Sequence, residues 1–355
     1  MEQQVAYTPD AIRSQVFENP KARPRDLADK LGIAEGALVA AHIGHGSVAV
    51  EAHPDKLMPA ICALGEVMAL TRNISAVHEK IGTYANYHAG DHAAMVLADA
   101  IDLRIFPKHW QHAYAVNKLG PDGQTRHSLQ IFDAAGDAVH KVILRDTSDL
   151  DAWHKLVAEL AVPHASSTPG LSPRSAVEAP KADESKTDIL RREWAKLSDT
   201  HQFMRLTAKL KMNRLGAYRI VGAPFAQALV PTALNDALEA LSESGTPVMI
   251  FVGNRGCIQI HSGPIDRLMP MGPWQNVMDP DFNLHLRADH IAELWLVEKP
   301  AKRGPATSLE AFDAEGRLIL QCFGLRKESG PDHSTAFAAM AKTLSTNNNL
   351  EATRQ

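Results

Sequence analysis

The sequence has few cysteines and no long apolar run. Its three cysteines, Cys62, Cys257 and Cys322, are an odd number without a CxxC spacing, which argues against a disulfide framework and a thiolate zinc site. No stretch of about 18 apolar residues occurs, so no membrane-spanning helix is expected. The first residues, MEQQVAYTPDAIRSQ, lack the basic and apolar regions of a secretory signal. These absences predict a cytoplasmic protein without membrane insertion.

An excess of positive charge is also missing. Lys and Arg number 37 against 41 Asp and Glu, a net charge of −4, whereas a generic nucleic-acid-binding protein has a basic excess. Residues 23–42 imitate a DNA-binding helix-turn-helix, but the second helix, AEGALVAAH, has no Arg, Lys, Asn or Gln with which to read base edges. The sequence therefore predicts no nucleic-acid partner.

The chain instead contains two similar halves. At 355 residues it is long for one hydrophobic core, and HSLQIFDAAGDAV (127–139) matches TSLEAFDAEGRLI (307–319) at an offset of 180 residues. At an offset of 181, IDLRIFPKHWQHAYAV (101–116) lies over FNLHLRADHIAELWLV (282–297), and Asn73 lies over Asn254. A period this long indicates a duplicated domain rather than a short solenoid repeat.

Both halves have the same expected order of elements. A helical region, 9–41 or 188–219, precedes a further helix, several short strands, a strand–turn–strand around FDAAGD or FDAEGR, and a closing helix. Consecutive strands without intervening helices predict an α+β fold with two mostly antiparallel sheets flanked by helices. The expected domains are 1–164 and 188–344, joined by a flexible Ser-, Pro- and Ala-rich linker, 165–187, and followed by a disordered tail, 345–355.

Several long motifs, in order, carry a resemblance to a known family. They are TRNISAVHEKIG (71–82), IDLRIF (101–106), LSDTHQFMRLT (197–207), FVGNRGCIQIHSGPI (251–265) and TSLEAFDAEGRLILQCFG (307–324). With the duplication, they make residues 12 to 343 similar to the HemS/HmuS/ChuS family of cytoplasmic haem-binding or haemin-degrading proteins of bacterial haem uptake. The resemblance implies haem b as cargo or substrate, with a haem oxygenase or the haem importer as partner, in a monomer or dimer.

The resemblance also implies a set of site residues. His201 matches the histidine that binds the haem iron, and Arg104 matches an arginine on the opposite, distal side of the haem. The remaining pocket positions are Arg214, Phe251, Lys299, Gln321, Phe323 and Arg326. Some members are expected to have tyrosine at the position of Phe323, and here the hydroxyl is missing.

The local pattern around His201 is compatible with iron binding. Ser198, Asp199 and Thr200 are candidate caps for a helix that starts at this point, and an apolar flank follows in QFMRL. When Ala217 is aligned with Ala37, His201 lies opposite a lysine, so the imidazole is no requirement of the shared scaffold. Taken alone, a histidine at a helix start is more often a surface or capping residue, and that alternative stays open.

Other candidates have plainer alternatives. Arg104 follows a strand pattern and could instead form a surface ion pair with Asp102, while Arg214, Lys299 and Arg326 could occupy solvated faces. His78 could contact a second haem or be a satisfied strand histidine. His88 and His92 have a spacing that suits two metal ligands on one helix face, but Gly90 between them weakens a helix and no third ligand is evident.

Two functions follow as expectations. The first is a binding protein that accepts imported haem through His201, shields it and passes it on for iron acquisition. The alternative is an enzyme that opens the porphyrin with reductant and dioxygen, with Arg104 as a distal catalytic group.

Overall fold

The computed structural model describes residues 7–120, 122–326 and 330–346, which form two compact units. Unit 1 comprises residues 1–72, 79–175 and 253–259, and unit 2 comprises residues 73–78, 176–252 and 260–355. Each unit is thus built mainly from one half of the chain and takes a short segment from the other half.

Unit 1 contains five helices of 6 to 11 residues, an antiparallel meander and a smaller strand group among its described residues. The helices are α1 (Pro9–Glu18), α2 (Pro24–Leu31), α3 (Glu35–Ala40), α4 (Pro54–Cys62) and α5 (Leu150–Leu160), with the 3₁₀ turn η1 (Pro107–His109). The meander runs β1 (Ser47–Val50), β7 (His112–Leu119), β8 (Thr125–Phe132), β9 (Ala138–Leu144), β2 (Glu66–Arg72). The smaller group is β6 (Asp102–Ile105), β5 (Ala94–Leu97), β4 (Tyr87–His88).

Unit 2 repeats this plan. Its helices are α6 (Thr187–Trp194), α7 (Gln202–Leu210), α8 (Arg214–Val221), α9 (Ala233–Ser244) and α10 (Ser334–Ala341), with η2 (Glu184–Lys186) and η3 (Ala288–His290). The meander runs β10 (Ala226–Leu229), β15 (Glu293–Lys299), β16 (Ala306–Phe312), β17 (Leu318–Gly324), β11 (Val248–Gly253), and β13 (Trp274–Met278) pairs with β14 (Phe282–Arg287). β3 (Ala76–Thr83) and β12 (Cys257–Gly263) have residues in both units.

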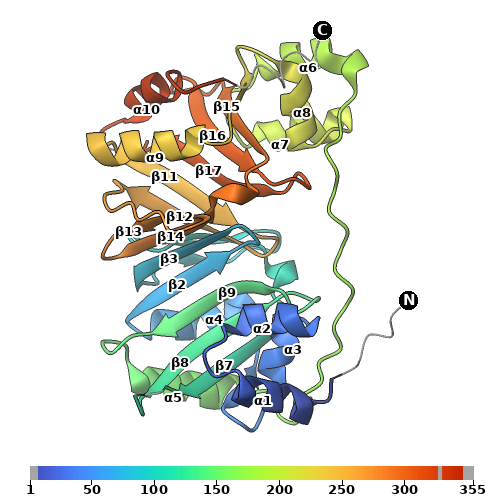
Figure 1. Cartoon of the computed structure of the whole chain (residues 1–355), viewed down its shortest axis with the longest axis vertical. Coiled ribbons are helices and arrows are strands. Elements are labelled where there is room, and N and C mark those ends of the chain that lie inside the picture. Colours follow the sequence, from blue (N-terminus) through green and yellow to red (C-terminus); the bar gives the residue numbers. More distant parts are fainter. Residues whose placement is uncertain (1–6, 121, 327–329, 347–355) are drawn as a thin grey trace. The chain divides into compact units, whose positions relative to one another are not determined.

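The sheet of unit 2 has two differently covered faces. Figure 1 shows α9 and α10 on one side of it and α6, α7 and α8 on the other. The first face carries an aliphatic core with Leu294, Leu309 and Cys322, and the second carries an aromatic core that includes Trp194 and Trp295. Because successive strand residues point to opposite faces, β15, β16 and β17 each contribute to both cores.

An identical turn connects the last two strands of each meander. Asp133 Oδ1 accepts the backbone N–H groups of Ala135 and Asp137, and Gly136 has φ +79°. Asp313 accepts from the equivalent positions, and Gly316 has φ +83°. Aspartate supplies the local acceptor and glycine the left-handed backbone, which is why FDAAGD and FDAEGR predicted strand–turn–strand structures.

Two asparagines at equivalent positions fix the exchanged segments. Asn73 Nδ2 donates to the Ile319 carbonyl (2.8 Å) in unit 2, and Asn254 Nδ2 donates to the Val139 carbonyl (2.8 Å) in unit 1. The side-chain oxygen of each accepts backbone N–H groups two and three residues further on. An asparagine therefore stabilises the same kind of turn at the equivalent position of each unit.

The predicted α+β duplication is confirmed, and the structure adds detail that the patterns did not show. Short strands such as β1, β10 and β13 were not predicted, nor was the exchange of segments 73–78 and 253–259. No helix in the described part of the chain is long and apolar enough to cross a membrane.

The segment between the halves contacts both units. Arg174 forms a bidentate ion pair with Asp137 of unit 1, and Lys181 N donates to Asn213 of unit 2. The predicted tail, 345–355, lies outside the described residues from 347 onward. Before that point, the Ser345 carbonyl accepts the N–H of Val230.

Candidate functional site

The histidine that the motifs singled out lies at the start of α7 with its imidazole in solvent. The His201 side chain is 91% exposed. Its backbone N–H and its Nδ1 both face Asp199 Oδ1, at 2.7 and 2.8 Å. An acceptor at Nδ1 keeps the proton on that nitrogen and leaves Nε2 as the free lone pair. The helix begins at Gln202, so His201, rather than one of the three preceding residues, occupies the capping position.

Two predicted cations, Arg214 and Lys299, meet on a carboxylate that the sequence reasoning missed. Lys299 Nζ donates to Glu310 Oε1 (2.7 Å), and Arg214 donates to Glu310 Oε2 (2.8 Å). The Tyr218 hydroxyl also donates to Oε2 (2.9 Å), and Ser308 donates to Oε1 (3.0 Å). Glu310 is completely buried and Lys299 is 3% exposed, so this cluster is a desolvated network and not a surface ion pair.

Electrostatics keep this network ionised. Burial alone would raise the pKa of the Glu310 carboxyl, but Lys299 and Arg214 together hold that pKa well below its ordinary value. Burial lowers the pKa of Lys299, and Glu310 opposes that shift. Two cations against one carboxylate leave a net positive charge, and the side chain that reaches solvent is that of Arg214, 24% exposed.

Aromatic side chains from the start of α7 and its neighbours pack against this network. Phe203, the second residue of α7, is buried against Trp194 (4.7 Å between ring centroids) and Tyr218 (5.6 Å). Lys299 Nζ lies 5.0 Å from the centre of the Phe203 ring. Met204, on the next position, is 52% exposed, and its sulfur is 3.6 Å from Arg214. One flank of α7 is thus apolar and open beside a cation.

Phe251, Gln321 and Phe323 lie together on the aromatic-core face of the same sheet. Phe251 pairs with Gln321 across β11 and β17, and Gln321 pairs with Glu310 across β17 and β16. The Phe251 and Phe323 rings are edge-to-face at 5.4 Å. All three side chains are half-buried, so α6, α7 and α8 leave this part of the face partly uncovered. It can offer apolar contact to a flat ligand.

The remaining candidates have other partners. Arg326 pairs with Asp332 and donates to the Gly304 carbonyl and to Ser334, which places it at the start of α10. Arg104, in unit 1, forms an ion pair with Asp102 and its side chain is 33% exposed. This is the surface ion pair that the sequence offered as the alternative to a distal role. His78 is completely buried, with its ring 5.0 Å from that of Phe282. His88 lies on β4 and not on a helix.

Comparison with known proteins decides the family. The model of the haemin-degrading HemS/ChuX domain matches residues 32–160 and again 211–344. The chain belongs to this family. It is 39% identical to the hemin transport protein HmuS of Yersinia pestis over 320 residues, 89% of this chain and 91% of that protein.

Solved structures agree with this assignment. Holo-PhuS, a heme-binding protein from Pseudomonas aeruginosa, has a TM-score of 0.90 at 39% identity and covers 96% of this chain and 100% of its own. ChuS, described as an E. coli heme oxygenase, has a TM-score of 0.84 at 32% identity, with 94% and 99% coverage. The family includes proteins described by two different activities.

Sequence reasoning missed Asp199 as the partner of the imidazole and Glu310 as the centre of the cation cluster. A signal for Glu310 was present. In the aligned motifs HSLQIFD and TSLEAFD, Glu310 lies opposite Gln130, so one half alone has a carboxylate at this strand position. An unpaired charge inside an otherwise apolar strand predicts a buried partner.

Proposed function

We propose that this chain binds haem in unit 2 through His201 and passes it on, as a cytoplasmic carrier in haem uptake. The observation that carries the proposal is the exposed His201 imidazole, held at Nδ1 by Asp199, in a family whose relatives are described as hemin transport and heme-binding proteins. Haem supplies the iron that Nε2 would bind. An exposed single ligand suits release as well as capture.

The surrounding residues fit the rest of the ligand. A haem needs apolar walls and cations for its two propionates. Phe251 and Phe323 offer the apolar surface, and Arg214 is the cation with access to solvent. Lys299 is enclosed by Glu310, Tyr218 and Phe203, so its role is to hold Arg214 and Glu310 in place. Phe323 has no hydroxyl to donate to the haem or to water.

Hemin titration of His201→Ala tests the ligand. We expect a shifted Soret band and an affinity more than about tenfold weaker, because removal of a group that merely supports a metal ligand already costs about tenfold. Exposed His45 in unit 1 provides the matched control, His45→Gln. An unchanged spectrum and affinity in His201→Ala would overturn the proposal.

The role of Asp199 is tested separately. Asp199→Ala removes the acceptor at Nδ1 and should weaken hemin binding about tenfold with a changed Soret band, whereas Asp199→Asn keeps an oxygen acceptor and should retain most of the affinity. The control is Asp188→Ala, another exposed carboxylate near a helix start. Equal affinities of Asp199→Ala and wild type would show that this contact does not position the imidazole.

A second candidate function is haem degradation, favoured by the 32% identity to ChuS over nearly the whole chain. The distal role of Arg104 belongs to this candidate, because a guanidinium can donate hydrogen bonds to a ligand on the far side of the iron. The test supplies hemin-loaded protein with reductant in air, with catalase present to remove free peroxide. Porphyrin opening that persists and depends on Arg104 favours the enzyme, and its loss under catalase favours the carrier.

A further inference from the structure

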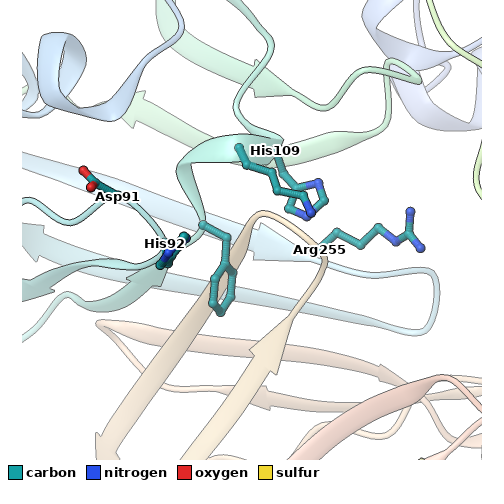
Figure 2. Close-up of a pocket in the computed structure, with 6 residues that line it drawn as sticks. Asp91, His92, His109 and Arg255 are labelled. Atoms are coloured by element: carbon teal, nitrogen blue, oxygen red, sulfur yellow. The ribbon is translucent and has the colours of Figure 1, made fainter. Parts of the chain in front are cut away.

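A second feature of the molecule, a pocket in unit 1, has a charge distribution that the haem proposal does not use. Its cavity of about 330 Å³ is lined by Asp91, His92, Phe106, Lys108, His109 and Arg255. This volume is at the lower end of small-molecule sites in proteins. In Figure 2, His109 and Arg255 lie at one end of the pocket, and the Asp91 carboxylate lies at the other.

The cationic end is held by a rigid turn. The Gly256 carbonyl accepts the N–H of Phe106 (3.0 Å) and the indole N–H of Trp110 (2.9 Å). A Cβ on Gly256 would come within 2.6 Å of Val139 and 3.2 Å of the His109 side chain, so the turn lies closely against η1. The backbone at Arg255 is therefore held next to the turn that carries Lys108 and His109.

The charges at this end are not neutralised by the protein. Neither Lys108 nor Arg255 has an ion-pair partner within the described residues. Burial, then Lys108, then Arg255 lower the pKa of His109, and Asp133 opposes that shift. An anion at this position would be attracted to Lys108 and Arg255, and the neutral His109 imidazole would donate an N–H to it.

The duplicated half shows that the scaffold does not require these cations. At the equivalent positions of unit 2, Phe106 and Lys108 are replaced by Arg287 and Asp289, and Arg255 by Ile74, whereas the histidine is kept as His290. There the charges pair internally, because Arg287 donates to Asp289 (2.7 Å) and Ser75 lies 3.0 Å from the His290 ring. Both units have a 3₁₀ turn at this point, and unit 1 leaves it open and basic.

We propose that this pocket binds a phosphate-type oxyanion of a small organic molecule, with Arg255, Lys108 and His109 as the polar contacts and Phe106 as an apolar wall. Arg255 offers a planar fork of donors and Lys108 a compact charge. The ring of Phe106 favours a flat substituent on the anion. This site involves none of the residues assigned to haem.

Two probes test the site, inorganic phosphate and phenyl phosphate, which share the dianion and differ by a ring. Binding is followed through the imidazole NMR signals of His109 and His92 in the full chain. We expect saturable shifts of His109 with either probe. Tighter binding of phenyl phosphate supports an organic phosphate as the ligand, and equal binding of the two probes would overturn the organic part of the proposal.

Substitutions locate the binding. Arg255→Gln and Lys108→Gln should each weaken the binding about tenfold, whereas Lys56→Gln, which removes an exposed charge on α4, should leave it unchanged. All three residues are exposed, so the fold should tolerate the changes. The absence of saturable His109 shifts with both probes, or affinities unaltered in Arg255→Gln and Lys108→Gln, would overturn the proposal.

Discussion

At the scale of single residues, the motifs led to the imidazole but not to what holds it. Asp199 is two positions before His201 and was visible as a helix-cap candidate, yet its contact with Nδ1 depends on the backbone turn between them. Glu310 is 96 residues from Arg214 and 11 from Lys299. These contacts of Glu310 form only when α8 packs on β15 and β16, and local sequence patterns do not predict that packing.

The buried position of Glu310 predicts a large effect of its substitution on the free energy of unfolding. Glu310→Gln removes the carboxylate and leaves the buried Lys299 and the partly exposed Arg214 without a counter-charge, so we expect unfolding of unit 2 to become easier by about 3–5 kcal/mol. Urea unfolding followed by tryptophan fluorescence measures it. Glu239→Gln, at an exposed position on α9, is the control and should change stability by less than about 0.5 kcal/mol. Similar losses in both variants would contradict the role of the network.

His140 predicts how stability depends on pH. Its imidazole is buried between Thr71 (2.8 Å) and the Tyr84 hydroxyl (2.6 Å), and burial lowers its pKa from 6.5 to about 3. The unfolded chain therefore binds one more proton between these values. The free energy of unfolding should fall as the pH drops from about 6.5 towards 3, by up to about 1.4 kcal/mol per pH unit.

His140→Gln keeps hydrogen-bonding groups but cannot titrate, so its stability should decrease less steeply over the same pH range. The comparison is urea unfolding of wild type and variant at a series of pH values. The exposed His45→Gln variant should retain the wild-type slope. Parallel curves for wild type and His140→Gln would show that His140 does not titrate on unfolding.

At the scale of elements, the long periodic segments were predicted well and the short ones were not. The helices at 54–62, 150–160 and 233–244 and the longer strands of both meanders agree with the patterns. β1, β10 and β13 have four or five residues, too few for an alternation to be distinguished from a loop. Their positions are determined by pairing with strands far away in the sequence.

The contact between α8 and the segment that joins the halves gives a prediction at this scale. A side chain on Gly216 would overlap the backbone of Lys181, which hydrogen-bonds to Asn213 in both directions. Although alanine favours a helix by about 1 kcal/mol over glycine, we expect Gly216→Ala to displace this segment at a cost of about 1–3 kcal/mol.

Limited trypsin digestion reports the displacement as faster cleavage after Lys181. Gly170→Ala is the matched control, because a Cβ at Gly170 meets no atom within 4 Å, and its digestion should follow that of wild type. Unchanged cleavage in Gly216→Ala would show that α8 accommodates the methyl group without moving the segment.

At the scale of the whole molecule, the duplication was the feature that sequence comparison predicted best. Two halves with the same motifs in the same order constrain the fold far more than composition does, and their differences show where the two halves have diverged. His201 and Glu310 differ in this way from their counterparts, and so do Lys108 and Arg255. Segment exchange was not predictable, because the motifs on both sides of it are the same.

That exchange is reciprocal, and Asn73 and Asn254 make it so. Each holds a turn of one half of the chain against the strand of the other half, with the same donor and the same acceptors. Because each turn has an asparagine of its own, a substitution at Asn73 removes the hydrogen bonds of one turn and leaves those of the equivalent turn in place.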